Sequence, residues 1–97
     1  MLKKRFFKTK SDCEVTFEMN PEGVQKMALV CQANEWEPVA MKRAGKGPFK
    51  TRIRLPKDSE FEFRYLVDQD QWLNDDSADA YRTNEHGSQN SVVVTTP

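Results

Sequence analysis

The sequence predicts an all-β domain, an immunoglobulin-like β-sandwich of about seven antiparallel strands. Three observations lead to this class. Apolar and polar residues alternate along several segments, a period of two that turns one face of each strand to a core and the other to solvent. Clusters of Gly, Pro, Asn, Asp and Ser separate these segments at short intervals. The 97 residues are enough for one domain with a single core, and strands and turns at this spacing are typical of a sandwich.

The strands can be placed in order along the chain. Alternation is clearest in 12–19, 49–55 and 61–68, where every second residue is apolar or aromatic. Two short runs of β-forming residues, 26–31 and 90–96, and two weaker patterns, 3–8 and 39–43, supply the other strands. The seven predicted strands are 3–8, 12–19, 26–31, 39–43, 49–55, 61–68 and 90–96.

Turn residues mark the ends of these strands, at 20–23, 44–48, 56–59 and 68–70. Residues 77–87 have no apolar stripe, so we expect a loop there rather than a helix. The inward phase of the strands gives the expected core: Phe17, Leu29, Ile53, Phe63, Tyr65 and Val92.

Composition excludes several classes of protein. The 15 basic and 15 acidic residues balance, so we expect no nucleic-acid partner and no attraction to anionic lipid. No apolar run approaches the ~20 residues that span a bilayer. The first ten residues are charged but lack the apolar region of a signal peptide. These features predict a cytoplasmic protein without a membrane segment.

The two cysteines, Cys13 and Cys31, lie in the inward phase of successive strands. A disulfide between them is geometrically open, but cytosolic thiols stay reduced and a buried thiol packs as a small apolar group. We therefore expect two structural thiols. The absence of a CxxC pair excludes a zinc ribbon or redox motif, and we expect neither cofactor nor metal.

An acidic cluster follows the third clear strand. Asp68, Asp70, Asn74, Asp76 and Asp79 have the spacing of a calcium-binding loop. Where that loop requires glycine for its sharp turn, however, the sequence has Leu73. We expect no EF-hand, and we interpret the cluster as a solvated, turn-rich loop.

No constellation predicts catalysis. Two of the carboxylates could serve a glycosidase only if a cleft desolvated one of them. His86, the single histidine, has no nucleophile motif beside it. The glycines and lysines of 42–47 lack the spacing of a phosphate-binding loop. The basic residues of 50–54 are interpreted as the solvent-exposed face of a strand. We expect the chain not to be an enzyme.

Two tryptophans lie in polar surroundings. Trp36 has Asn34 and Pro38 two positions away, and Trp72 has Asp70 and Asn74. A core tryptophan normally has apolar neighbours there, so partial exposure is expected, although either ring could instead cap an end of the core. Exposed indoles are suited to stacking on the C–H faces of a pyranose, with polar groups such as Asn34, Arg64 and Asn90 for its hydroxyls.

The order of these elements resembles carbohydrate-binding module family 48. The segments "ANEW", "RLPKDSEFEFRYLVDQDQW" and "NDDSADAYRTNEHGSQNSVVVT" follow the family pattern over about 25–96. These glycogen-binding, early-set domains precede the catalytic barrel of glucan branching and debranching enzymes, and they occur in the β subunits of AMP-activated protein kinase. The resemblance implies the same immunoglobulin-like fold and binding of α-1,4-glucan.

The resemblance also implies a site. Trp36 and Trp72 correspond to the family's stacking tryptophans, and Arg64 to its basic residue on the hairpin strand. Asn90 matches the asparagine that follows the glycine turn, where Gly87 is the glycine and Ser88 the small hydroxyl residue. Three features depart from the pattern: His86 replaces the leucine that projects through the sugar ring, Cys31–Asn34 replaces a G-S-F-N segment, and Gln69 or Asp70 replaces the hairpin glycine. The implied site residues are Asn34, Trp36, Arg64, Trp72, His86, Gly87, Ser88 and Asn90.

The expected function is therefore a non-catalytic module that binds glycogen, starch or maltodextrin. The alternative is an architectural or protein-interaction module associated with a glucan-processing enzyme, with weak or no sugar binding. Exposure of both tryptophans favours the first, and burial of either favours the second.

Overall fold

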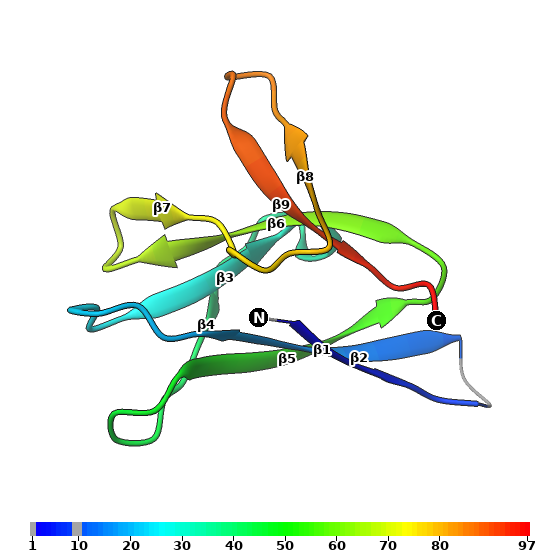
Figure 1. Ribbon diagram of the computed structural model, residues 1–97, viewed down its shortest axis with the longest axis horizontal. Helices are drawn as coiled ribbons and strands as arrows, with labels where there is room; N and C mark the ends of the chain where they lie inside the picture. Colours follow the sequence, from blue (N-terminus) through cyan, green and yellow to red (C-terminus); the bar gives the residue numbers. More distant parts are fainter. Residues whose placement is uncertain (1, 9–10) are drawn as a thin grey trace.

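The structure is a computed structural model that describes residues 2–8 and 11–97, and these form an all-β sandwich (Figure 1). A short 3-10 turn, η1, covers Gln32–Asn34. The strands of the described residues are β1 (Leu2–Phe6), β2 (Asp12–Met19), β3 (Met27–Cys31), β4 (Val39–Ala40), β5 (Phe49–Pro56), β6 (Glu60–Val67), β7 (Gln71–Leu73), β8 (Ala80–Thr83) and β9 (Gln89–Val94).

The strands form two antiparallel sheets that pack face to face (Figure 1). The smaller sheet has the order β1-β2-β5, and the larger has the order β4-β3-β6-β9-β8. One side of β6 is shared, because β9 pairs with Glu60–Phe63 and β7 pairs with Tyr65–Val67. The class of fold predicted from the period of two is confirmed.

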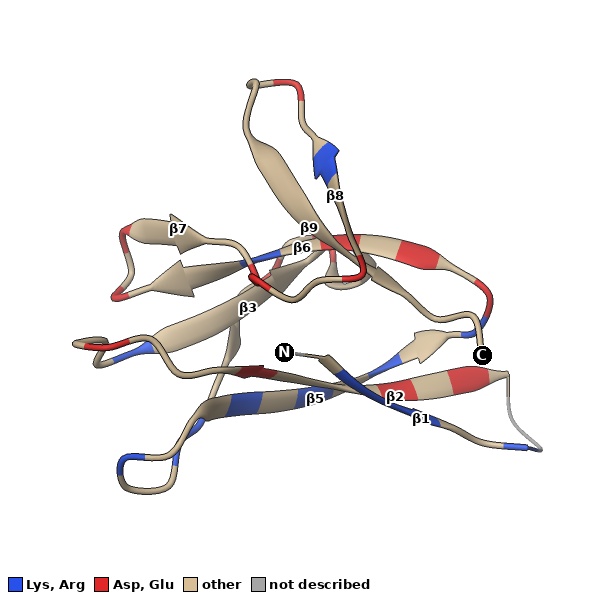
Figure 2. Ribbon diagram, viewed as in Figure 1, with Lys and Arg blue, Asp and Glu red and all other residues tan. Residues whose placement is uncertain are grey.

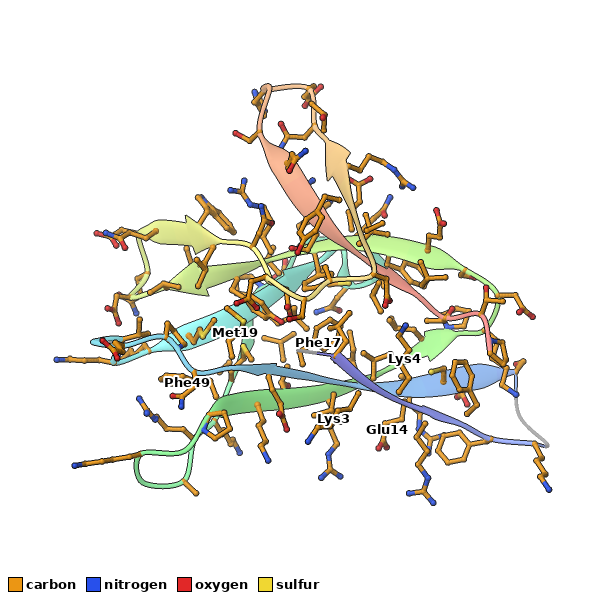
Figure 3. The ribbon with its side chains drawn as sticks, in the orientation of Figure 1. Lys3, Lys4, Glu14, Phe17, Met19 and Phe49 are labelled. Carbon is orange, nitrogen blue, oxygen red and sulfur yellow. The ribbon has the colours of Figure 1, made fainter. Side chains whose placement is uncertain are left out.

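Alternation decides which side chains enter the core. Cys13, Val15 and Phe17 of β2 are fully buried, and the residues between them face away. Figure 3 shows Phe17 and Met19 directed between the sheets, with Lys3 and Glu14 on the opposite side of the smaller sheet.

Aromatic rings join the two sheets at the centre. The Phe17 and Phe63 rings meet edge to face with centroids 5.0 Å apart, and Phe63 and Tyr65 meet at 5.6 Å. Edge-to-face pairs of this kind contribute about 0.5–1.5 kcal/mol beyond the area they bury.

The predicted core is confirmed at five of its positions and differs at one, Ile53. Phe17, Leu29, Phe63 and Tyr65 are fully buried, whereas Ile53 is only partly buried against the core. Val92 is buried outside the core cluster, because it lies opposite Glu62 and so shares the outward phase of β6.

Two strands differ from the prediction. Residues 77–87 were expected to form a loop, but Ala80–Thr83 forms β8, whose four exposed residues pair with β9. Trp72 lies just beyond the 68–70 turn, but residues 71–73 also form a short strand, β7, that was not predicted. Neither strand has an apolar pattern of its own. Each forms only because it hydrogen-bonds to a longer neighbouring strand, so its own residues gave no signal.

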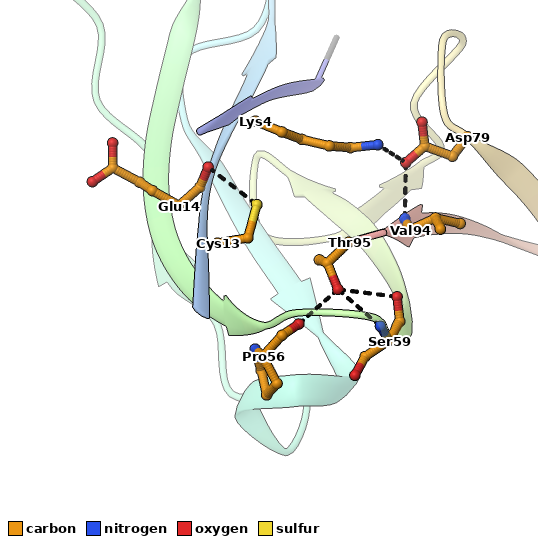
Figure 4. A network of polar contacts seen from close by, with 8 residues as sticks. All are labelled: Lys4, Cys13, Glu14, Pro56, Ser59, Asp79, Val94 and Thr95. Carbon is orange, nitrogen blue, oxygen red and sulfur yellow. Dashed lines mark hydrogen bonds and ion pairs between the residues drawn. The ribbon is translucent and has the colours of Figure 1, made fainter. Parts of the chain in front are cut away.

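A buried threonine forms hydrogen bonds with the segment that connects the two sheets. The chain crosses from β5 to β6 through the turn that holds Lys57 and Asp58, and Thr95 packs beside it without exposure (Figure 4). The Thr95 hydroxyl donates to the Pro56 carbonyl at 2.6 Å and accepts from the Ser59 N–H at 3.0 Å. The backbone N–H of Thr95 donates to the Ser59 carbonyl at 2.9 Å.

A second polar contact joins the sheets near their ends. Lys4 points inward from the edge strand β1, and its ammonium lies 2.6 Å from the Asp79 carboxylate (Figure 4). The same Asp79 oxygen accepts from the Val94 N–H at 2.8 Å. An inward charge on an edge strand also disfavours pairing with another chain.

We expect Thr95→Val to lower the free energy of unfolding by about 1–3 kcal/mol, because it removes two hydrogen bonds from a buried position while keeping the shape of the side chain. Urea unfolding monitored by tryptophan fluorescence measures this change. Thr96→Val is the matched control, since Thr96 is exposed. Equal effects of the two substitutions would contradict the proposed contribution of the Thr95 hydroxyl.

Candidate functional site

The outward face of the larger sheet brings together two of the eight predicted site residues, Arg64 and Trp72. Residues opposite one another in antiparallel strands share a face. Trp72 lies opposite Leu66, which lies opposite Ala28, and Arg64 lies opposite Val30 in the next row. We call this surface the Trp72 face. Its residues are Ala28, Val30, Ala40, Glu62, Arg64, Leu66 and Trp72.

Trp72 and Arg64 contact each other on this face. The guanidinium carbon of Arg64 lies 5.5 Å from the centre of the Trp72 ring, whose side chain is 51% exposed. The Nε–H of Arg64 is buried and has no acceptor. Among the described residues, the Arg64 guanidinium forms no side-chain hydrogen bond or ion pair.

Asn90 lies at the other end of the Trp72 face, where its amide is already engaged. Its Nδ2 donates to Glu62 at 3.0 Å, and its Oδ1 accepts from Asn84 at 3.3 Å. The side chain is buried. Glu62 also faces Arg82, at 3.8 Å, and Arg82 bonds Glu60 at 2.8 Å. Asn90 therefore holds the carboxylate of Glu62 in place next to the row of Arg64.

Trp36 is presented by strained backbone. Glu35 and Trp36 both have left-handed conformations, with φ of 54° and 63°, which cost about 1–2 kcal/mol in a residue other than glycine. Backbone bonds hold this turn: the N–H of Glu35 donates to Gln32 and that of Trp36 to Cys31. The Asn34 side chain donates to the carbonyl of Glu37 at 3.3 Å. Such strain persists where the surroundings impose it, and it is common at functional sites.

Both tryptophans are exposed, as the sequence predicts, with Trp36 at 41%. Trp36 belongs to the segment between β3 and β4, at the edge of the same sheet. Neither indole packs against another aromatic ring in the described part of the chain. The register brings Trp72 and Arg64 together.

A shallow hollow of about 220 Å³ lies beside Trp72. Leu66 and Ala28, which share the row of Trp72, form part of its wall, and Pro38, two residues beyond Trp36, forms another part. Its remaining lining is Lys26, Met27, Ala40 and Gln69. The hollow extends the apolar surface of the indole toward the edge of the sheet.

The β8–β9 turn carries the remaining predicted residues. Asn84 organises it, because its Oδ1 accepts from the N–H of His86 at 2.9 Å and of Ser88 at 3.1 Å. Gly87 has a φ of 82°, a conformation that favours glycine. The His86 side chain is exposed, and its Nε2 lies 3.7 Å from Glu85.

Several acidic residues of this cluster form hydrogen bonds within the fold, although we expected a solvated loop. Asp68 accepts from the N–H groups of Gln25 and Lys26, and Asp79 joins the sheets. Asp75, which the sequence did not single out, is fully buried and accepts from the Tyr65 hydroxyl at 2.8 Å. Burial and this carboxylate raise the pKa of the Tyr65 phenol. Among residues 2–8 and 11–97, no three His, Cys, Asp or Glu side chains gather as ligands for a metal.

The cysteines are free and buried in the structure, as predicted. The Cys13 thiol donates to the Glu14 carbonyl at 3.8 Å (Figure 4). Burial raises the pKa of Cys13 and also that of Cys31, so both thiols stay protonated and unreactive near neutral pH.

No protein-family model matches this sequence, and no curated protein sequence does either. The described residues contain no helix long and apolar enough to cross a membrane.

Sequence reasoning missed three residues of the candidate site. Glu62 and Leu66 share the period of two with Arg64, so the phase of β6 could have placed them on the same face. Asn84 had no comparable signal, because its contacts depend on the pairing of β8 with β9.

We expect Glu35→Gly to raise the free energy of unfolding by about 1 kcal/mol, because glycine adopts the left-handed conformation without a steric cost. Glu37→Gly is the control: Glu37 is also exposed but has no positive φ, so this change should lower stability slightly. Chemical denaturation of both variants measures the difference. Loss of stability in Glu35→Gly equal to that of the control would argue against strain at this turn.

Proposed function

We propose that this chain is a non-catalytic carbohydrate-binding module of the family 48 type that binds α-1,4-glucan on the Trp72 face. One observation carries the proposal. An exposed indole, Trp72, lies against a guanidinium, Arg64, whose donors have no acceptor among the described residues. A ligand that stacks on the first and accepts hydrogen bonds from the second would complete this arrangement.

The charges nearby favour a neutral, polyhydroxylated ligand. An anion at Arg64 would meet Glu62, which is two positions along the same strand and shares its face. A sugar hydroxyl, in contrast, can accept from Arg64 and donate to the Glu62 carboxylate. The Trp72 ring and the hollow lined by Leu66 and Ala28 supply apolar surface for the C–H faces of the glucose units.

The family resemblance agrees with this arrangement. The segment "FRYLVDQDQW" runs through β6 and β7 and supplies both Arg64 and Trp72. The segment "ANEW" ends at Trp36, which would provide a second stacking ring at the edge of the sheet. His86, which stands where the family has a leucine, is exposed at the tip of the β8–β9 hairpin. We expect the domain to act in the cytoplasm.

The second candidate is an architectural module that docks on a glucan-processing enzyme and binds sugar weakly. The buried amide of Asn90 favours it, because Glu62 and Asn84 already use the groups that the resemblance assigns to sugar. In neither case do we assign catalysis to this chain; two of its acids, Asp68 and Asp79, are held by structural hydrogen bonds.

Titration with maltoheptaose, followed by tryptophan fluorescence, tests the proposal. We expect a dissociation constant on the order of micromolar to millimolar, about 4–8 kcal/mol, because hydroxyls exchange water for protein with little net gain. Trp36→Ala and Trp72→Ala should each weaken binding about tenfold or more, and the tryptophan that remains reports the titration. Arg64→Gln should also weaken binding, and Arg52→Gln, which changes an exposed arginine of the other sheet, should not.

A circular dichroism spectrum of each variant checks that the fold is retained. No fluorescence response of the unmodified chain at several millimolar maltoheptaose would refute the sugar-binding proposal and leave the architectural candidate. Loss of binding in Arg52→Gln equal to that in Arg64→Gln would place the ligand elsewhere.

A further inference from the structure

The outward face of the smaller sheet is a second surface that the proposed sugar site does not use. Exposed cations point outward from β1 and β5, where Figure 2 shows basic residues along both strands and in the hairpin that leads into β5. Lys42 joins them, because it pairs directly with Lys50 at the base of this hairpin. We call this surface the basic face. Its cations are Lys3, Arg5, Lys42, Lys50, Arg52 and Arg54.

Three acids of β2 share the basic face, but they lie beneath the cations. The Glu18 side chain is only 11% exposed, whereas its partners Lys3 and Lys50 are 59% and 53% exposed. Burial raises the pKa of the Glu18 carboxyl, and hydrogen bonds from both lysines more than offset this, so the pKa lies below its usual value. The other two acids, Asp12 and Glu14, are half-buried. The charge presented to solvent is therefore positive.

The charges do not cancel within this face. Its six cations exceed its three acids by three, although the whole chain has no net charge. Arg52 has no acid opposite it, because its neighbour across the sheet is Thr16 and the next residue in the row is Lys3. Lys42 and Lys50 lie directly opposite each other, and like charges in that position destabilise a strand pair.

A hollow adjoins this like-charge pair. It has a volume of about 400 Å³, and its lining is Lys42, Arg43, Ala44, Gly47, Pro48 and Lys50. Arg43 is fixed there, since it donates to the carbonyls of Gly47 and Val24 and lies over the Phe49 ring. An acidic side chain placed in this hollow would offset the repulsion between the two lysines.

We propose that the basic face is a docking surface for an acidic protein segment in extended conformation. Lys50, Arg52 and Arg54 project from alternate positions of β5, about 7 Å apart. An extended peptide with glutamates at every second position has the same spacing, so its carboxylates can meet these cations in turn. Arginine side chains suit this contact because they bind carboxylates through two parallel hydrogen bonds.

Nucleic acid suits the basic face less well. Single strands bind through exposed aromatic rings on which bases stack. The aromatic ring nearest these cations, Phe7, is half-buried and lies between Arg5 and Arg54, at 5.3 Å and 4.9 Å.

The test is fluorescence anisotropy of a labelled peptide of four Glu-Ser repeats. We expect the folded chain to bind it at about 20 mM salt and to bind at least about tenfold more weakly at about 200 mM, because salt screens exposed charges. Arg52→Glu should weaken binding about tenfold or more. Lys26→Glu, the same change at an exposed cation of the larger sheet, should have less than a twofold effect.

Three results would overturn the proposal: no binding of the peptide at millimolar concentrations of the chain, equal losses in Arg52→Glu and Lys26→Glu, or tighter binding of an eight-nucleotide oligo-dT than of the peptide. Titration of Arg52→Glu with maltoheptaose separates this surface from the Trp72 face. Because the two surfaces belong to different sheets, loss of peptide binding should leave the sugar titration unchanged.

Discussion

The contact between the Phe17 and Phe63 rings is the interaction on which the rest of the structure depends. It joins β2 of one sheet to β6 of the other at the centre of the core. Because side chains alternate along a strand, fixing these two rings inward also fixes their neighbours outward. Glu18 and Thr16 then face solvent on one sheet, and Glu62 and Arg64 do so on the other. These two outward faces carry the two proposed binding surfaces.

The fold followed from local pattern where a strand buries one face. Residues 12–19 coincide with β2 because their alternation is matched by burial at every second position. The strand Ala80–Thr83 was missed for the opposite reason: all four residues are exposed, and only pairing with β9 makes them a strand. Val92 is buried as predicted, but the run of three valines in β9 has no alternation from which its outward phase could be read.

The sequence predicted that the two tryptophans are exposed, but not which residues of the site contact one another. Polar neighbours of Trp36 and Trp72 indicated exposure, and both rings are exposed. The contact between Arg64 and Trp72 depends on the register of β6 with β7, and the bond between Glu62 and Asn90 depends on that of β6 with β9. Such long-range pairings leave no mark on the spacing of residues along the chain.

Two features of the Trp72 face oppose stability. Glu35 and Trp36 keep left-handed backbone, and the Nε–H of Arg64 is buried without an acceptor. Each costs about 1–3 kcal/mol, a large share of the roughly 5–15 kcal/mol that keeps a domain folded. A glycine at position 35 or an apolar residue at position 64 would remove these costs. In the proposed function, a bound glucan would cover the exposed Trp72 ring beside this guanidinium.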